Sequence, residues 1–333
     1  MPTDALDYIT IQGFKSIASI ENLMLRPINV VIGPNGSGKS NFIGVFEFFQ
    51  EIIEHRLKNY VAASGGAEKI LHFGSKVTRE IVIDFAFEGG NYAIRLRPST
   101  DDGLYESGGR FTPVDSGVRW TIYHFDDTSS SSLLRKTAQV DDNRFLRADG
   151  ANLPAFLHLL RERHRGSYDL IVQTVQRVAP FFEEFQLDPL LLRPDDIKLE
   201  WRHKRSDQYF DASSLSDGTL RFIALATLFL QPQQFRPSVI LVDEPELGLH
   251  PYALEVLAAL IRQASATSQV IVSTQSSPLL DHFLPEDVLV ADRVDGGTQL
   301  TRLDEHRLAK WLEDYSLGQL WEKNEIGGRP VPG

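Results

Sequence analysis

The fold of this chain is decided by the stretch Gly33-Pro34-Asn35-Gly36-Ser37-Gly38-Lys39-Ser40. It matches G-x-x-x-x-G-K-[ST], the pattern of a glycine-rich loop whose backbone N–H groups surround phosphate oxygens. The apolar run 28–32 precedes the loop, and a stretch with helical spacing, residues 41–57, follows it. This strand, loop and helix order is the context that the pattern requires. A glycine-rich turn with a chance Lys-Ser pair is the weaker alternative. The sequence therefore predicts a nucleoside triphosphate site.

The expected nucleotide ligands are the residues of this loop and of the turn after it: Asn35, Gly36, Ser37, Gly38, Lys39, Ser40 and Asn41. Lys39 would bring a mobile positive charge to the β and γ phosphate oxygens, which also gives it a catalytic role. Ser40 would offer its hydroxyl to Mg²⁺. Binding alone does not say what is done with the nucleotide.

A second apolar run, residues 238–242, ends in Asp243, Glu244 and Pro245. Such a continuous run suits a parallel strand that is covered on both faces. At the strand's carboxyl end, Asp243 would hold Mg²⁺ and Glu244 would take a proton from the attacking water. A strand that merely ends in a solvated turn is the alternative, which the phosphate loop in the same chain disfavours. Adjacent Asp and Glu favour hydrolysis over phosphoryl transfer to a small molecule.

Between these motifs, residues 213–221 precede the apolar, helix-like run 222–230. Ser216 and Gly218 can present a hydroxyl and unhindered N–H groups at the helix amino terminus, where an anion is favoured. Alone, Ser-Asp-Gly would be an ordinary helix cap. Together with the two other motifs, it resembles the signature of ABC-type ATPases. Their usual Leu-Ser-Gly-Gly appears here as Leu215-Ser216-Asp217-Gly218, a variant that resembles RecF-like and SMC-like members.

The resemblance extends to other parts of the chain. Residues 246–251, Glu-Leu-Gly-Leu-His-Pro, resemble the run typical of the RecF-like group at the position of the ABC D-loop. Pro251 suits the first turn of a helix over residues 252–264. Residues 9–17 resemble the opening strand of RecF and SMC heads, and residues 311–321 resemble the tail of short RecF-like predicted ATPases. Most of the chain is covered in this way.

The fold class that this resemblance implies is α/β: a P-loop NTPase of the ABC-ATPase head type. It would have a mixed sheet flanked by helices, an antiparallel β subdomain and an inserted helical lobe. We expect a single head over 1–333, with a nucleotide-binding lobe at 1–125 and 206–333 and an inserted helical and signature lobe at 126–205. Alternation predicts a hairpin over 80–96, a strand over 118–123 and a second hairpin over 199–210, and apolar spacing predicts helices over 153–163 and 168–182.

The resemblance also implies ATP and Mg²⁺ as bound groups, and a homodimer that forms on ATP binding. In that class, the signature of one subunit closes over the γ-phosphate held by another. Ser216, Asp217 and Gly218 would therefore act in trans. A two-fold arrangement satisfies both sites with one pair of surfaces.

Two glutamines occupy positions that matter in ABC ATPases. The strand 269–273 is followed by Gln275, where ABC transporters place a switch histidine. Glutamine can orient a phosphate or water but does not titrate near neutrality as histidine does. Its alternative is a polar residue that ends a core strand. Gln139 is the nearest candidate for the Q-loop contact to Mg²⁺, with an ordinary surface glutamine as the alternative.

Composition limits the possible classes. The chain has 333 residues, 42% of them apolar, which allows one large or two coupled domains. It has no cysteine, which excludes disulfides and cysteine-ligated metals. The sequence shows no signal peptide or long apolar span, so we expect a cytoplasmic setting and no membrane partner. The apolar spacing does not sustain heptads, which argues against a long coiled coil. Related overcoming-lysogenization-defect nucleases carry a Toprim domain after the ATPase; we expect none here and hence no intrinsic nuclease.

The formal net charge of −11 argues against a protein that coats nucleic acid through its overall field. Two basic clusters, residues 161–165 and 202–205, could still contact phosphate, although solvated helix or hairpin faces are the alternative. A DNA partner is thus implied mainly by the resemblance.

The preferred interpretation is an ATP-hydrolysing switch in DNA repair or anti-phage defence. The alternative is a regulatory or sensor module with negligible turnover that acts with an effector protein. A transporter subunit is disfavoured by the divergent signature and by Gln275.

Overall fold

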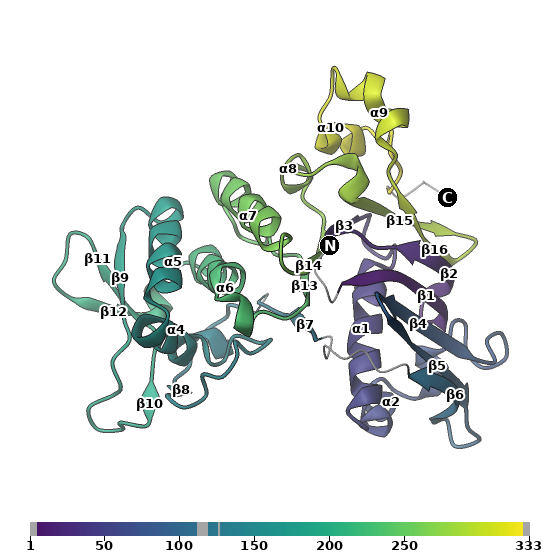
Figure 1. Ribbon diagram of the computed structural model, residues 1–333, viewed down its shortest axis with the longest axis horizontal. Coiled ribbons are helices and arrows are strands. Elements are labelled where there is room, and N and C mark those ends of the chain that lie inside the picture. Colours follow the sequence, from purple (N-terminus) through teal and green to yellow (C-terminus); the bar gives the residue numbers. More distant parts are fainter. Residues whose placement is uncertain (1–4, 112–118, 126, 329–333) are drawn as a thin grey trace.

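The computed structural model describes residues 5–111, 119–125 and 127–328. Its centre is a six-stranded sheet with the order β16-β15-β3-β14-β13-β7 (Figure 1). The strands are β3 (Ile28–Ile32), β7 (Trp120–Tyr123), β13 (Val239–Asp243), β14 (Gln269–Thr274), β15 (Val288–Val294) and β16 (Gly297–Arg302). All neighbours are parallel except β15 and β16, which form an antiparallel hairpin. The carboxyl ends of five strands therefore meet along one edge of the sheet.

Both faces of this sheet are buried. Val31 and Leu241 pack into one hydrophobic cluster, whereas Val30 and Val242 belong to a second cluster on the opposite face. Because side chains alternate along a strand, each of these strands needs apolar residues at consecutive positions. This is the physical reason for the uninterrupted apolar runs in the sequence.

One face of the sheet is covered by α1 (Lys39–Ile53), which begins directly after the glycine-rich loop. An antiparallel sheet with the order β2-β1-β4-β5-β6 packs against the same helix. Its strands are β1 (Leu6–Phe14), β2 (Ile17–Met24), β4 (Ile81–Phe87), β5 (Gly90–Pro98) and β6 (Leu104–Phe111). Aromatic rings fill the interface, since Phe46 and Phe49 of α1 lie 5.1 and 4.7 Å from the ring of Phe85. The short helices α2 (Leu57–Ala63) and α3 (Ala67–Ile70) follow α1.

The other face is covered by α6 (Asp217–Leu230) and α7 (Pro251–Ala264). Beyond α6 lies a lobe that Figure 1 shows in teal, on the side away from α1. It contains the helices α4 (Leu153–Arg163) and α5 (Arg165–Val178). Two small sheets complete it: β9 (Phe182–Gln186), β11 (Glu200–His203) and β12 (Tyr209–Asp211) form one, and β8 (Ala138–Gln139) and β10 (Asp196–Ile197) form the other. The lobe and α6 share one hydrophobic cluster, so the helix connects the lobe to the sheet.

The C-terminal elements are α8 (Ser277–Leu280), α9 (Glu305–Leu312) and α10 (Leu317–Glu322). The chain then passes along β15, where the N–H of Gly328 donates to Asp292 Oδ1 at 2.7 Å. Trp321 Nε1 donates to the carbonyl oxygen of Gly328 at 3.2 Å. These bonds hold the last described residues beside the glycine-rich loop.

Most predicted elements are present, with changes at their ends. The helix α4 has the predicted bounds, and the hairpins at 80–96 and 199–210 are formed. The helix α5 ends at Val178 because β9 begins at Phe182, and α1 ends at Ile53, two residues before His55 with its positive φ of 58°. The predicted strand 118–123 is β7, an edge strand of the parallel sheet; Val118 and the lobe boundary at 126 lie outside the described residues. No helix in the described ranges is long and apolar enough to span a membrane.

Candidate active site

The candidate site lies where the glycine-rich loop, Glu244 and Gln275 follow three adjacent strands. In the register of the sheet, Thr274 pairs with Ile32, and Ser273 pairs with Asp243. The next residues along β3, β13 and β14 therefore emerge at the same level of the carboxyl edge. This is the position at which open α/β sheets bind ligands.

Glycines give the loop its path. A Cβ at Gly38 would lie 2.0 Å from Thr298 Oγ1, and a Cβ at Gly33 would lie 2.4 Å from the carbonyl oxygen of Ala291. Gly38 also has a φ of 103°, which side chains rarely adopt. Larger residues at these two positions would push the loop off β15 and β16.

Lys39 is buried, and its Nζ donates to the carbonyl oxygens of Gly33 at 2.8 Å and Pro34 at 3.2 Å. Burial lowers the pKa of Lys39, while the charges of Glu244 and Asp243 oppose this shift. The ammonium thus lies inside the loop, close enough to both carboxylates to interact with them electrostatically. A buried ammonium within a glycine-rich loop suits an anionic phosphate as its ligand.

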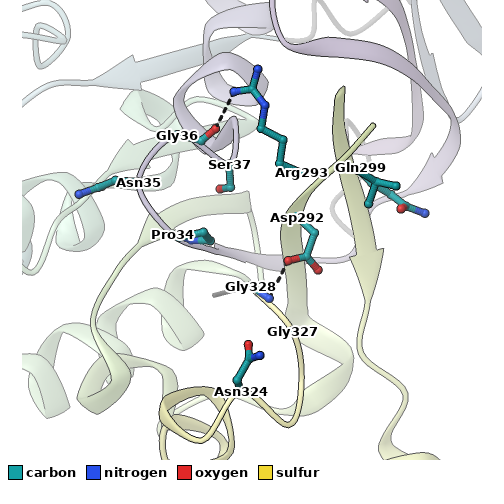
Figure 2. A pocket seen from close by; sticks show the side chains of 11 residues that line it. Pro34, Asn35, Gly36, Ser37, Asp292, Arg293, Gln299, Asn324, Gly327 and Gly328 are labelled. Carbon is teal, nitrogen blue, oxygen red and sulfur yellow. Dashed lines mark hydrogen bonds between the residues drawn. The ribbon is translucent and has the colours of Figure 1, made fainter. Parts of the chain in front are cut away.

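The other predicted loop ligands have different environments. Ser37 is 1% exposed, and within the described part of the chain its Oγ has no hydrogen-bond partner. Ser40 is exposed in the first turn of α1. Asn41 Nδ2 donates to Ser16 Oγ at 2.7 Å, so this side chain ties α1 to the β1–β2 turn. Figure 2 shows the outer side of the loop, where Asn35 projects and Arg293 Nη1 donates to the oxygen of Gly36 at 3.3 Å.

Asp243 ends β13 beside Ser273, whose hydroxyl donates to its carboxylate. Burial raises the pKa of Asp243, which the hydrogen bond from Ser273 counteracts. Glu244 follows with a φ of 44°, in the left-handed region that favours glycine. Its N–H donates to the Ser273 carbonyl oxygen at 2.9 Å, and its carboxylate accepts from Gln275 Nε2. The structure therefore brings Glu244 and Gln275 into direct contact.

Two further residues lie at the site without a role predicted from the sequence: Glu246, which opens the run at the D-loop position, and His124, which belongs to no motif. Glu246 accepts from Thr274 Oγ1 at 2.5 Å and from the N–H of Gln275 at 2.9 Å, so it fixes the backbone that carries Gln275. His124 follows β7, level with Asp243, and its charge would lower the pKa of that carboxyl. In the sequence, His124 stands out only because it directly follows an apolar strand. The pairing of β7 with β13 is what places it beside Asp243.

Gln139 is not brought to the site. It is an exposed residue of β8, paired with Asp196 of β10. Figure 1 shows β8 in the lobe, away from β3 and α1. The residue that follows β7, the edge strand beside β13, is His124.

The signature forms a compact unit with the segment after Glu244. Ser216 caps α6, accepting from the N–H of Thr219 at 3.2 Å. Gly218 packs directly on Gly248, because a Cβ at Gly218 would lie 2.1 Å from the Gly248 oxygen. Arg221 Nε donates to the oxygen of Phe125 at 2.8 Å, and its Nη1 donates to that of Leu247. Since α6 and α1 cover opposite faces of the sheet, the structure keeps the signature helix apart from the loop helix of its own chain.

Comparisons with known proteins agree with this geometry. The sequence pattern of a family described as an AAA domain, putative AbiEii toxin, type IV TA system, matches residues 28–281. No curated protein sequence matches the chain significantly. Domains of this ATPase type generally bind and hydrolyse ATP.

Solved structures of SMC heads share the fold at low sequence identity. An Smc head bound to the C-winged helix domain of ScpA has a TM-score of 0.64 and 17% identity over 92% of this chain and 99% of that chain. A head with an extended coiled coil from Pyrococcus furiosus, bound to the C-terminal domain of ScpA, has a TM-score of 0.59 and 16% identity over 93% of this chain and 98% of that chain. A head with a coiled coil and joint from Pyrococcus yayanosii has a TM-score of 0.59 and 12% identity over 93% of this chain and 99% of that chain. The chain thus belongs to the AAA-domain family of the putative AbiEii toxins, and its fold is that of an SMC-like and RecF-like ABC-type ATPase head.

Proposed function

We propose that this protein is an ATP-hydrolysing molecular switch that dimerises head-to-tail around two ATP molecules. One observation supports the proposal most strongly. The buried ammonium of Lys39 lies near the carboxylates of Asp243 and Glu244 at the carboxyl edge of the sheet. A cation for phosphate and a carboxylate for the attacking water are the two groups that ATP hydrolysis needs from the protein.

The loop would bind the phosphates through its N–H groups and Lys39. Mg²⁺ would neutralise charge that develops on the phosphate oxygens. Asp243 and Ser40 would hold this ion, because a carboxylate and a hydroxyl supply the oxygen ligands that it prefers. The buried Ser37 hydroxyl, which lacks a partner among the described atoms, supports a polar ligand in the loop.

Glu244 would accept the proton of the attacking water. Gln275 would orient that carboxylate through the hydrogen bond from its amide, and Glu246 would hold Gln275 in place. Gln275 acts here by position, since an amide carries no proton charge near neutrality.

Dimerisation would supply the signature in trans. The amino terminus of α6, capped by Ser216, offers N–H groups and a favourable dipole to an anion. The separation of α6 from α1 supports a role on the partner's nucleotide. The close packing of Gly218 on Gly248 would make signature and D-loop move together.

The switch would act on an effector protein, in phage defence or DNA repair. Two SMC heads of similar fold were solved with ScpA domains bound, which supports a protein partner. The family description, a putative toxin of a toxin–antitoxin system, favours the defence setting.

A regulatory module with negligible turnover is the second candidate. It is favoured by one observation: the carboxylate of Glu244 is already engaged by Gln275 in this conformation. That hydrogen bond occupies one of the two carboxylate oxygens, which leaves only the other to accept a proton.

Calorimetric ATP titration and steady-state hydrolysis of wild type and Lys39→Ala test the proposal. We expect ATP affinity to fall roughly tenfold to a hundredfold in the variant, because a charge-assisted contact is lost. Lys310→Ala, which removes an exposed lysine of α9, is the matched control and should bind as wild type does. Equal affinity of Lys39→Ala and wild type would overturn the nucleotide site. Binding without measurable hydrolysis by wild type would support the regulatory module.

A further inference from the structure

The glycine-rich loop is held from behind by a side chain of β16. Thr298 of this strand is 3% exposed, and its Oγ1 donates to the carbonyl oxygen of Ser37 at 2.8 Å. The fit is close, since a Cβ at Gly38 would lie 2.0 Å from the same Oγ1. Because threonine is branched at Cβ, its side chain has little rotational freedom. A buried and stiff hydroxyl therefore holds one peptide group of the loop.

A short chain of hydrogen bonds fixes the direction in which Thr298 donates. A hydroxyl has one proton, and that of Thr298 is used on the oxygen of Ser37. Ser16 Oγ lies 2.7 Å from Thr298 Oγ1, so Ser16 is the donor in this pair. Ser16 Oγ in turn accepts from Asn41 Nδ2 at 2.7 Å. The protons thus point one way, from α1 through the β1–β2 turn and β16 to the loop.

The backbone of the β15–β16 hairpin is fixed as well. The N–H of Thr298 donates to the carbonyl oxygen of Ser16 at 2.7 Å, which ties the hairpin to the β1–β2 turn. Arg293 Nη1 donates to the carbonyl oxygen of Gly36 at 3.3 Å (Figure 2). The side chains of one hairpin therefore hold the carbonyl oxygens of two consecutive loop residues, Gly36 and Ser37.

Peptide geometry connects this anchor with the phosphate site. The C=O and N–H of a trans peptide group point in opposite directions. Because the C=O of Ser37 points toward β16, the N–H of Gly38 points away from that strand. The strands β15 and β16 lie on one side of β3, and β13, whose carboxylates interact with Lys39, lies on the other. We expect the phosphates on the β13 side, a step that rests on the proposed function.

We infer that Thr298 is a positioning residue for the nucleotide: it holds the peptide group between Ser37 and Gly38 so that the N–H of Gly38 faces the phosphates before they bind. A donor that is already in place needs no reorganisation when the anion arrives. Without the hydroxyl, the oxygen of Ser37 would lose its partner, and the peptide group would rotate toward another donor. The N–H of Gly38 would turn with it, and phosphate affinity would fall in a loop that is still folded.

Calorimetric titrations with ATP and with inorganic tripolyphosphate test this inference. Thr298→Val replaces the hydroxyl by a methyl group of similar size. We expect the affinity for both ligands to fall about threefold to tenfold, the effect of one neutral hydrogen bond. Thr298→Ser keeps the hydroxyl and should bind both ligands as wild type does. Urea unfolding shows whether Thr298→Val is folded; if it is not, Thr298→Ala is measured in its place with the same expectation.

Thr227→Val is the matched control. Thr227 is fully buried in α6, and its Oγ1 also donates to a backbone oxygen, that of Ile223, at 2.8 Å. This variant should bind both ligands as wild type does, even where urea unfolding shows that it has lost as much stability as Thr298→Val.

Three results would overturn the positioning role of Thr298. Wild-type affinity in Thr298→Val would mean that the hydroxyl does not aim the loop. An equal loss in Thr298→Ser would assign the effect to the packing of the methyl group. A loss for ATP without a loss for tripolyphosphate would place the effect away from the phosphates. If wild type bound neither ligand, the proposed function itself would fail, and this inference with it.

Discussion

Arg135 and Asp217 form an ion pair, with Nη2 and Oδ1 2.7 Å apart, that joins the segment before β8 to the first turn of α6. The same guanidinium donates to the carbonyl oxygens of Ala212 and Leu215, just before the signature. Asp217 stands where ABC ATPases usually have a glycine. Arg135 therefore balances the charge of the Asp217 carboxylate at the helix end that is proposed to meet the partner's nucleotide.

Arg135→Met should destabilise the protein much more than Asp217→Asn. The arginine side chain is 9% exposed and bonds to several backbone oxygens, so its loss should lower the free energy of unfolding by about 2 kcal/mol. The aspartate side chain is 65% exposed, and its half of the pair should contribute less than about 1 kcal/mol. Urea unfolding of both variants measures the difference. Equal losses would mean that the ion pair, not the backbone contacts, is the important part.

Much of the fold could be predicted from sequence because its signals are local. Local residues determine the geometry of three features: the glycine-rich loop, the apolar run before Asp243 and the Ser216 cap. The predicted bounds of α4 are confirmed. The apolar runs indicated parallel strands because burial on two faces leaves no alternation.

The rest depends on contacts between distant segments. His124 becomes a neighbour of Asp243 only through the pairing of β7 with β13. Arg135 reaches Asp217 across 82 positions of the chain. The sequence offers Gln139 as the nearest Q-loop candidate, but the pairing of β8 with β10 places this residue in the lobe.

Glu246→Gln should change how stability depends on pH. Burial raises the pKa of Glu246 above its ordinary value of 4.5, against the hydrogen bonds from Thr274 and Gln275. A carboxyl whose pKa is higher in the folded state stabilises the fold below its unfolded pKa, and this contribution is lost as the pH rises through the folded value. Glu246→Gln has no carboxyl at this position, so its stability does not fall with pH for this reason. The free energy of unfolding of the variant, relative to that of wild type, should therefore increase from pH 4.5 upward, by about 1.4 kcal/mol per unit of pKa shift. Parallel curves for the two proteins, measured without nucleotide, would contradict this.

Ser216→Arg should separate binding from dimerisation. The substitution fills the amino end of α6 with a large side chain, and this end is proposed to meet only the partner's nucleotide. Monomer affinity for ATP should stay at the wild-type value, while the ATP-dependent dimer and turnover are lost. Calorimetry and sedimentation velocity measure the two effects. Weaker ATP binding by the monomer would show that the signature acts within its own chain.

The basic clusters should contribute little to DNA binding. Arg161 pairs with Asp188 at 2.9 Å, and Arg202 pairs with Glu184 at 2.9 Å, so both already have carboxylate partners. Replacing Arg161 and Arg202 by Ala should therefore leave the salt dependence of duplex binding unchanged. A salt slope that flattens by roughly one unit per residue would instead place these side chains on phosphates.

Glu244→Gln should stall the enzyme with ATP bound. The amide keeps the shape of the side chain but accepts no proton, so turnover should fall by roughly two to four orders of magnitude while ATP still binds. It also keeps an oxygen for the hydrogen bond from Gln275, which limits structural change at the site. If hydrolysis releases the dimer, the variant should accumulate as a dimer with ATP and Mg²⁺ but not with ADP, as size-exclusion chromatography would detect. Ser216→Arg combined with Glu244→Gln is the control, and it should remain monomeric with ATP. Turnover at the wild-type rate in Glu244→Gln would rule out Glu244 as the base and leave Glu246, the other carboxylate beside Gln275, as the residue to test next.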